Sequence, residues 1–190
     1  NKLITVDGLK IHLVALDTRF FRSDLIELKG KYPLFGINET EDSTILGDAQ
    51  WIWLEKILQI EADIVILISS IQVLPEDHGY EKWSLFPNEM RRLLANIEKT
   101  KAKTIIISGD RHKAAIYNNK DIFEITSSSL NRPISTFNMT RPNETDSLMF
   151  GKVYNKENYG LLTFDTESNT LEMSIKDING ATVNSVSLNL

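Results

Sequence analysis

The 190-residue chain contains no cysteine. This absence excludes disulfide bonds, zinc–thiolate sites and thiol nucleophiles, so any bound metal must be held by His, Asp, Glu, Asn or water. The sequence also lacks an apolar run of about 20 residues, the length that spans a bilayer. The formal net charge of −5 argues against nucleic acid as a structural partner, because affinity for a phosphate backbone comes from clustered Lys and Arg.

Three common catalytic signatures are missing as well. The sequence has neither a phosphate-binding P-loop nor the glycine pattern of a dinucleotide-binding fold. The hydroxyl groups at 126–129 lack the G-x-S-x-G elbow that exposes a nucleophilic serine. We expect these hydroxyls to satisfy backbone groups at a strand end, with ligand contact as the alternative.

The first 110 residues alternate between buried strands and amphipathic helices. The strands are β-branched apolar runs, and the helices carry apolar side chains at spacings of three and four residues. The expected elements are strands over 10–17, 62–70 and 103–108 and helices over 48–58 and 87–97. Asp48 stands where an N-cap would be, and Gly109 is expected to turn the backbone sharply after the third strand. This order predicts a right-handed α/β arrangement with functional residues at the carboxyl ends of the strands.

Beyond residue 120 the pattern changes to short strands, which predict an antiparallel sheet. The expected strands cover residues 122–126, 160–165, 170–176 and 181–188, with a hairpin turn at Asn179-Gly180. Residues 131–158 are rich in Pro, Asn and Thr and are expected to form a loop or a lid. The length favours one domain, or a large piece of one, over two domains. Because the chain opens at Asn1 without a Met or a signal peptide, we expect this start to be a cut.

Polar side chains follow the predicted strands and suggest a site. Asp110 and His112 come directly after the third strand, a spacing that lets both bind one metal ion. The alternative to metal binding is an ordinary turn at the end of the strand, in which His112 is exposed to solvent. Asp17 and Arg19 follow the first strand, and Arg19 suits the capture of a phosphoryl group, although an Asp–Arg ion pair is an equal alternative. Arg22 is expected to lie on the surface.

The loop over residues 72–83 gathers acidic, imidazole and aromatic side chains before the second helix. Such a loop would line a pocket, with solvated side chains as the alternative for His78. Trp83 is expected to be a packing anchor, and His12, inside a strand pattern, a structural histidine.

Six short blocks, in this order, make the chain resemble PhoD-like alkaline phosphatases. They are LDTRFFR (16–22), LGDAQWIWL (46–54), SSIQV (69–73), HGYEKW (78–83) with FP (86–87), SGDRH (108–112) and ITSS (125–128). The resemblance implies the metallophosphoesterase fold, an α/β/β/α sandwich with a metal centre at the sheet edges. It also implies that residues 1–190 are the C-terminal part of one metallophosphatase domain, with the antiparallel tail in the second sheet.

The resemblance implies Asp110 and His112 as ligands of a divalent metal or iron, with Ca, Fe, Mn and Zn all open and more than one ion in the full site. The other ligand blocks of the family precede the LDTR strand, so the N-terminal half of the same protein would be the missing partner. Where the superfamily has a ligand histidine after the second strand, this chain has Ile71-Gln72, and Gln72 is a weak substitute. This chain alone is expected to be inactive.

The implied function is metal-assisted hydrolysis of phosphate mono- or diesters, with Arg19 and His78 as catalytic or substrate-binding groups. The rival hypothesis is a noncatalytic binding or structural module that keeps the sandwich without a complete metal centre. Completion of the site by a second chain of one cleaved protein is a third possibility. The family also suggests an extracytoplasmic bacterial protein.

Overall fold

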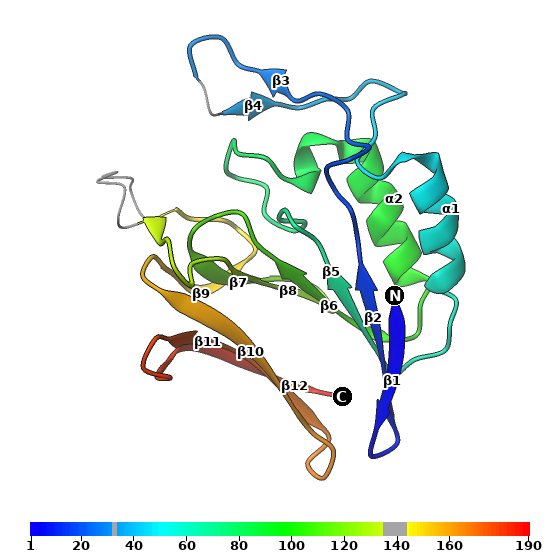
Figure 1. The fold of residues 1–190 in the computed structure, drawn as a ribbon, viewed down its shortest axis with the longest axis vertical. Helices are drawn as coiled ribbons and strands as arrows, with labels where there is room; N and C mark the ends of the chain where they lie inside the picture. Colours follow the sequence, from blue (N-terminus) through cyan, green and yellow to red (C-terminus); the bar gives the residue numbers. More distant parts are fainter. Residues whose placement is uncertain (32–33, 135–143) are drawn as a thin grey trace.

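The computed structural model describes residues 1–31, 34–134 and 144–190, which form three layers (Figure 1). Two helices cover one face of a seven-stranded sheet, and a three-stranded sheet covers the other face. The large sheet has the order β1-β2-β5-β6-β8-β7-β9, with β1 (Lys2–Val6), β2 (Leu9–Ala15), β5 (Ile64–Ile68), β6 (Lys103–Ser108), β7 (Ala114–Asn119), β8 (Ile122–Ser127) and β9 (Met149–Tyr154). The small sheet consists of β10 (Asn158–Asp165), β11 (Thr170–Asp177) and β12 (Thr182–Asn189). The remaining elements are α1 (Gly47–Ile57), α2 (Pro87–Glu98), the 3₁₀ turn η1 (Trp83–Leu85) and the short pair β3 (Ile26–Glu27) and β4 (Phe35–Gly36).

Four neighbouring strands at the centre of the large sheet, β2, β5, β6 and β8, run parallel. Their carboxyl ends therefore meet at one edge of the sheet. The loops after β2, β5 and β6 carry the LDTR, SSIQV and SGDRH blocks, so the topology gathers these blocks at that edge. The predicted α/β order of strands and helices is confirmed.

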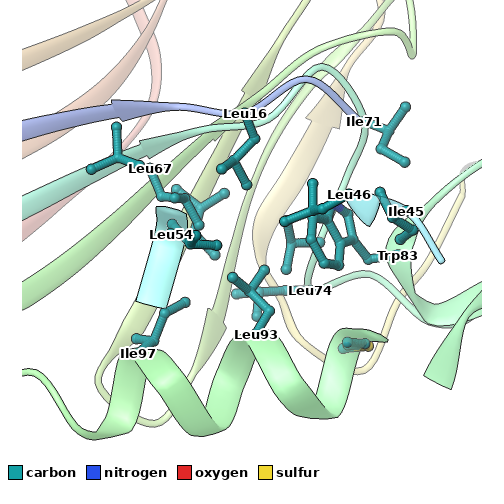
Figure 2. Close-up of a cluster of buried hydrophobic side chains, with 14 of the residues drawn as sticks. Leu16, Ile45, Leu46, Leu54, Leu67, Ile71, Leu74, Trp83, Leu93 and Ile97 are labelled. Carbon is teal, nitrogen blue, oxygen red and sulfur yellow. The ribbon is translucent and has the colours of Figure 1, made fainter. Parts of the chain in front are cut away.

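The helix-side core is built around two buried tryptophans and a set of aliphatic side chains (Figure 2). The rings of Trp51 and Trp83 meet edge to face with centroids 6.4 Å apart, which confirms Trp83 as a packing anchor. Figure 2 shows Leu93 and Ile97 projecting from α2 toward Leu54 of α1. On the opposite face, apolar side chains of the large sheet pack against β11, whose Leu171, Met173 and Ile175 are fully buried.

The expectation for the start of the first helix is wrong, and the turn after β6 has left-handed residues other than Gly109. Asp48 is not the N-cap, because α1 begins at Gly47 and Asp48 lies inside its first turn. The Thr44 hydroxyl instead accepts the Gly47 amide at 2.9 Å. Gly109 does not make the turn after β6 through a left-handed backbone. Asp110 and His112 adopt that conformation instead, with φ of 69° and 52°.

Several strands were missed by the sequence patterns. The hairpin of β1 and β2 turns at Asp7 and Gly8, both with positive φ, as a two-residue turn requires. Strand β9 lies inside the segment that was expected to be a loop or a lid, and it pairs with β7 next to an irregularity in register. Residues 135–143 of that segment lie outside the described residues. Within the described ranges, no helix has both the length and the apolar character needed to cross a membrane.

Candidate functional site at the carboxyl ends of the parallel strands

An ion-pair cluster joins the loops that follow β2 and β6. Arg19 donates to Asp110 Oδ1 at 2.6 Å and to Glu81 Oε2 at 3.0 Å, although Arg19 and Asp110 are 91 residues apart in the chain. The expectation that Arg19 and Asp110 face the same edge is confirmed. The Arg19 side chain is half exposed, so its guanidinium stands at a surface that a ligand can reach.

The turn that carries Arg19 is fixed by two neighbours. Asp17 Oδ1 accepts the backbone amides of Arg19 and Phe20 at 3.0 and 2.9 Å, and these two bonds lower the pKa of Asp17. Gln50 of α1 bonds both the amide and the carbonyl of Asp17. Asp17 therefore shapes the turn, while the partner of Arg19 is Asp110 and not Asp17.

Arg22 is mostly buried, and the expectation that it lies on the surface is wrong. Its Nε lies 3.1 Å from Glu81 Oε1, while the other oxygen of Glu81 accepts from Arg19. One carboxylate thus holds two guanidinium groups and ties the loop before η1 to the turn after β2. The LDTRFFR block placed both arginines within reach of this site, but its pattern gave no indication of Glu81.

Asp110 and His112 occupy a strained stretch of backbone. The left-handed conformation that both adopt costs energy in residues other than glycine, and such strain often marks functional sites. The His112 Nδ1 lies 2.6 Å from the Arg132 carbonyl oxygen. Because a carbonyl only accepts, Nδ1 carries the proton and Nε2 is the acceptor nitrogen of the ring, a tautomer that metal-binding histidines also adopt.

The described residues fit part of a metal site. None of the clusters that they form contains three or more His, Asp or Glu side chains able to hold one ion. Metal ions in proteins generally take at least three protein ligands or a larger number of oxygen ligands. If Asp110 and His112 bind an ion, further ligands would therefore have to come from residues outside the described ranges.

Gln72 connects several of these loops from a fully buried position. Its Nε2 donates to Thr126 Oγ1 at 2.8 Å and to the Tyr117 hydroxyl at 3.2 Å. Its Oε1 accepts from His78 Nε2 at 2.9 Å and from Arg111 Nη1 at 3.2 Å. All four hydrogen-bonding positions of the amide are used, so Gln72 acts here as an organising residue rather than as a ligand.

His78 is partly buried and both of its ring nitrogens are hydrogen-bonded to protein groups, so the alternative of a fully solvated side chain is wrong. Its Nε2 donates to Gln72, so its Nδ1 accepts the Tyr80 amide at 3.2 Å. Burial, together with the nearby charges of Arg111 and Lys82, lowers the pKa of His78 far below its ordinary value. The neutral ring fixes the loop, and its catalytic role stays a prediction.

The structural interpretations of His12 and of the hydroxyl cluster agree with the geometry. His12 is buried, and its Nε2 lies 3.1 Å from Asn1 Oδ1. Thr126 is buried and bonds Gln72 and Ser108, while Ser127 donates to Asn158 at 2.8 Å. Ser128 bonds backbone groups as expected, since its hydroxyl accepts the Arg111 amide at 3.0 Å and donates to the Lys113 carbonyl at 3.3 Å, whereas Thr126 and Ser127 bond side chains.

A groove of about 490 Å³ lies between the loop before η1, β4 and α2. It includes His78 and Lys82 together with apolar side chains such as Phe35, Leu85 and Met90. This groove does not contain Arg19, Asp110 or His112. His78 thus contacts a pocket, as the composition of its loop suggested, but this pocket is separate from the ion-pair cluster.

Glu124 was not identified from the sequence, although a carboxylate in the apolar run of β8 is an available signal. It is fully buried and accepts the Val73 and Leu74 amides at 3.1 and 2.6 Å and the Ser108 hydroxyl at 2.5 Å. Burial raises the pKa of Glu124 from 4.5 to about 7. The loop after β5 is therefore attached to a carboxyl group that titrates near neutral pH.

Replacing Glu124 by glutamine is expected to change how stability depends on pH. Since the folded pKa of about 7 exceeds the unfolded value of 4.5, the folded state binds more protons between these values. The stabilisation that Glu124 adds to the free energy of unfolding is therefore fully present below pH 4.5. It is lost as the pH rises to 7, and the loss is on the order of 3 kcal/mol. Urea unfolding at several pH values from 5 to about 8 should show this loss in the wild type and not in Glu124→Gln. Parallel profiles for the two proteins would contradict the assignment, and Glu172→Gln, an exposed change, serves as control.

Comparisons with known proteins agree with this fold. The family described as PhoD-like phosphatase matches residues 7–174. No curated protein matches the chain. A solved structure of GAP50, described as the anchor in the inner membrane complex of Plasmodium, superposes with a TM-score of 0.67 at 15% identity, over all of this chain and 53% of that one.

A structure of PhoD superposes with a TM-score of 0.64 at 14% identity, over 99% of this chain and 40% of that one. At such identities the likeness to both structures shows the fold alone, and this fold confirms the expected metallophosphoesterase class. The described residues form three layers of this fold: one layer of helices, the large sheet and the small second sheet. The chain spans about half the length of one matched structure and less of the other.

Proposed function

The chain belongs to the PhoD-like phosphatase family, and on this premise we propose that the complete protein hydrolyses phosphate mono- or diesters with bound metal ions. The family match over residues 7–174 is the observation that carries the proposal. The juxtaposition of Asp110, His112 and Arg19 at one sheet edge supports it, because metal ligands and a guanidinium suit a phosphoryl group.

Each residue of the candidate site has a proposed task. Asp110 and His112 hold one metal ion through a carboxylate oxygen and Nε2. When bound, metal ions in such sites activate a water molecule and neutralise phosphoryl oxygens. Arg19, kept at the surface by Glu81, binds the phosphoryl oxygens and stabilises the charge that develops on them. His78 keeps Gln72 and the Tyr80 amide in place and is an alternative substrate contact only if its ring changes partners.

The remaining ligands are proposed to lie in an N-terminal half of the same protein. The described residues offer two ligands, and the matched structures extend well beyond the region that this chain covers. On this proposal residues 1–190 are the C-terminal part of one domain and have no activity by themselves. The ions are Ca, Fe, Mn or Zn, and an extracytoplasmic location in a bacterium stays a prediction from the family.

Removal of metal is expected to abolish the activity of the complete protein. Hydrolysis of an aryl phosphate should fall to background after dialysis against a chelator, because the remaining side chains cannot activate water comparably. Adding Ca²⁺, Mn²⁺, Zn²⁺ or iron singly and in pairs should restore the rate and identify the ions. A chelated protein, shown to be free of metal by elemental analysis, that keeps its full rate would defeat the proposal.

A noncatalytic module is the second candidate, and one observation favours it. Arg19 forms an ion pair with Asp110, the carboxylate proposed as a metal ligand, so the charge of Asp110 is balanced without a metal ion. GAP50, to which the fold is similar, is described as an anchor. On this alternative the complete protein as purified would contain no stoichiometric metal and would hydrolyse no phosphate ester after metal is added.

A further inference from the structure

Two cationic side chains next to the candidate ligands are almost completely buried. The side chains of Arg111 and Lys113 are 5% and 2% exposed, and they alternate along the chain with Asp110 and His112. Lysine is among the residues that proteins bury least, and a buried ammonium requires compensating partners. The role proposed above for Asp110 and His112 uses neither cation.

A single carboxylate bridges these two cations. Glu144 Oε2 accepts from Arg111 Nη2 at 2.8 Å, and Oε1 forms an ion pair with Lys113 Nζ. The Glu144 side chain is 25% exposed, so this carboxylate reaches the buried cations from the surface. Each oxygen is directed at a different cation, which is also how two neighbouring oxygens of a phosphate group bind two cations.

The Lys113 ammonium is only partly satisfied by this contact. Among the described residues, Glu144 is the one carboxylate that pairs with its Nζ. An ammonium has three donors, and leaving them unmade in the interior is costly. A buried ammonium with a single carboxylate partner suits a ligand that offers more acceptor oxygens than one carboxylate provides.

Other charged groups surround Arg111 and Lys113, but most of them do not contact these two cations. Lys82 is a third buried cation near Arg111, and its Nζ donates to the carbonyl oxygens of Glu76 and His78. Asp146 is another nearby carboxylate, but its oxygens accept backbone amides, those of Glu76 at 2.9 Å, Asp77 at 3.1 Å and Leu148 at 2.9 Å. Asp110 lies near Arg111, and Glu76 and Asp77 lie near Lys82, but among the described carboxylates only Glu144 forms an ion pair with Arg111 or Lys113.

The Arg111 guanidinium is held rigidly in place. It stacks 4.4 Å from the centre of the Tyr80 ring and donates Nη1 to Gln72 Oε1 at 3.2 Å. Both contacts remain if Glu144 withdraws, because neither involves it. The cation is therefore organised in advance for an anion, and little conformational entropy opposes binding.

We propose that Arg111 and Lys113 form a binding site for a tetrahedral oxyanion, either inorganic phosphate or the phosphoryl group of an ester, and that the Glu144 carboxylate takes the place of this anion in the structure. Four oxygens of a tetrahedral anion can satisfy the fork of Arg111 and the donors of Lys113 together, which two carboxylate oxygens do not. The site does not depend on the proposed metal centre, since it uses different side chains.

Thermal unfolding of the complete protein tests this site, with a chelator present so that no metal centre binds the anion. Glu144→Gln has nearly the same shape as the wild type but leaves both cations without a carboxylate. Inorganic phosphate at about ten times its dissociation constant should raise the Tm of this variant by roughly 2 °C and that of the wild type by less. The double variant Glu144→Gln/Lys113→Met should show no such rise.

Two controls complete the experiment. Sodium chloride at equal ionic strength tests for screening, and Glu61→Gln removes an exposed carboxylate whose ion pair with Lys10 leaves the two side chains 90% and 44% exposed. Neither should reproduce the phosphate effect. Phenyl phosphate in place of inorganic phosphate separates the two sources: a similar rise indicates a phosphoryl subsite, and no rise indicates a site for the free anion.

Calorimetric titration with phosphate gives an independent measurement, in which Glu144→Gln should bind roughly tenfold more tightly than the wild type because no carboxylate competes. The site is disproved if phosphate binds Glu144→Gln no more tightly than the wild type, or if the double variant binds it equally well. In either of those cases Glu144, Arg111 and Lys113 are only a buried ion-pair network. Failure here would leave the metal-dependence experiment unaffected.

Discussion

Replacing Asp110 by asparagine is expected to lower kcat/KM of the complete protein for an aryl phosphate by roughly 10³-fold. Asparagine tolerates the left-handed backbone that Asp110 adopts, so the substitution removes charge while keeping the turn. The ion pair with Arg19 is also lost, but it is partly exposed and contributes little to folding. His112→Asn, at the other left-handed position, should have an effect of similar size.

The matched control is Asp121→Asn, an exposed aspartate in the turn between β7 and β8. This turn lies at the opposite end of the strands from the candidate site, so the rate should not change. Metal content measured on the same samples should fall in both ligand variants and stay constant in the control. An Asp110→Asn enzyme with wild-type kcat/KM would remove Asp110 from the site.

Replacing Glu89 by alanine is expected to lower the free energy of unfolding by about 4 kcal/mol. Glu89 is buried on α2 and accepts hydrogen bonds from the Thr44 hydroxyl at 2.8 Å, the Ile45 and Leu46 amides at 2.7 and 3.3 Å and the Trp51 indole at 2.9 Å. Alanine leaves these four donors buried without an acceptor, and each unsatisfied group costs about 1–3 kcal/mol before relaxation.

Urea unfolding followed by tryptophan fluorescence measures this loss, since Trp51 itself reports on the contact. Glu89→Gln should lose about half as much, because one amide oxygen still accepts. Glu98→Ala, an exposed glutamate on the same helix, should change stability by less than about 0.5 kcal/mol. If Glu89→Ala and Glu98→Ala unfold at the same urea concentration, Glu89 does not hold α1 to α2.

The elements that sequence patterns predicted best are those whose side chains all face one kind of environment. Strand β6 has the bounds that its run of isoleucines predicted, because a strand covered on both faces needs apolar residues throughout. Strand β9 was missed because Gly151 and Lys152 interrupt its pattern and because its pairing with β7 is decided by contacts distant in sequence. Propensity alone carries little information about such edge strands.

The candidate site likewise contains residues that the sequence predicts and residues that it does not. Arg19 and Asp110 could be brought together from the sequence because parallel strands align their carboxyl ends. Gln72 was interpreted only as a weak ligand, and Glu89 and Glu124 were not interpreted at all, since the partners lie far along the chain: Tyr117 for Gln72, Trp51 for Glu89 and Val73 for Glu124. A buried polar side chain shows in a sequence only as an exception to an apolar pattern, and its partner is not indicated.

The exposed side chains of the candidate site belong to loops, whereas most of the two apolar cores lies beneath them on either face of the sheet. Exposed loop positions such as Phe20 can therefore change without unfolding the body of the protein. Buried positions at the same edge, such as Ile71 and Lys113, are not free in this way, so laboratory evolution can explore the exposed loop positions while these residues and the scaffold stay constant.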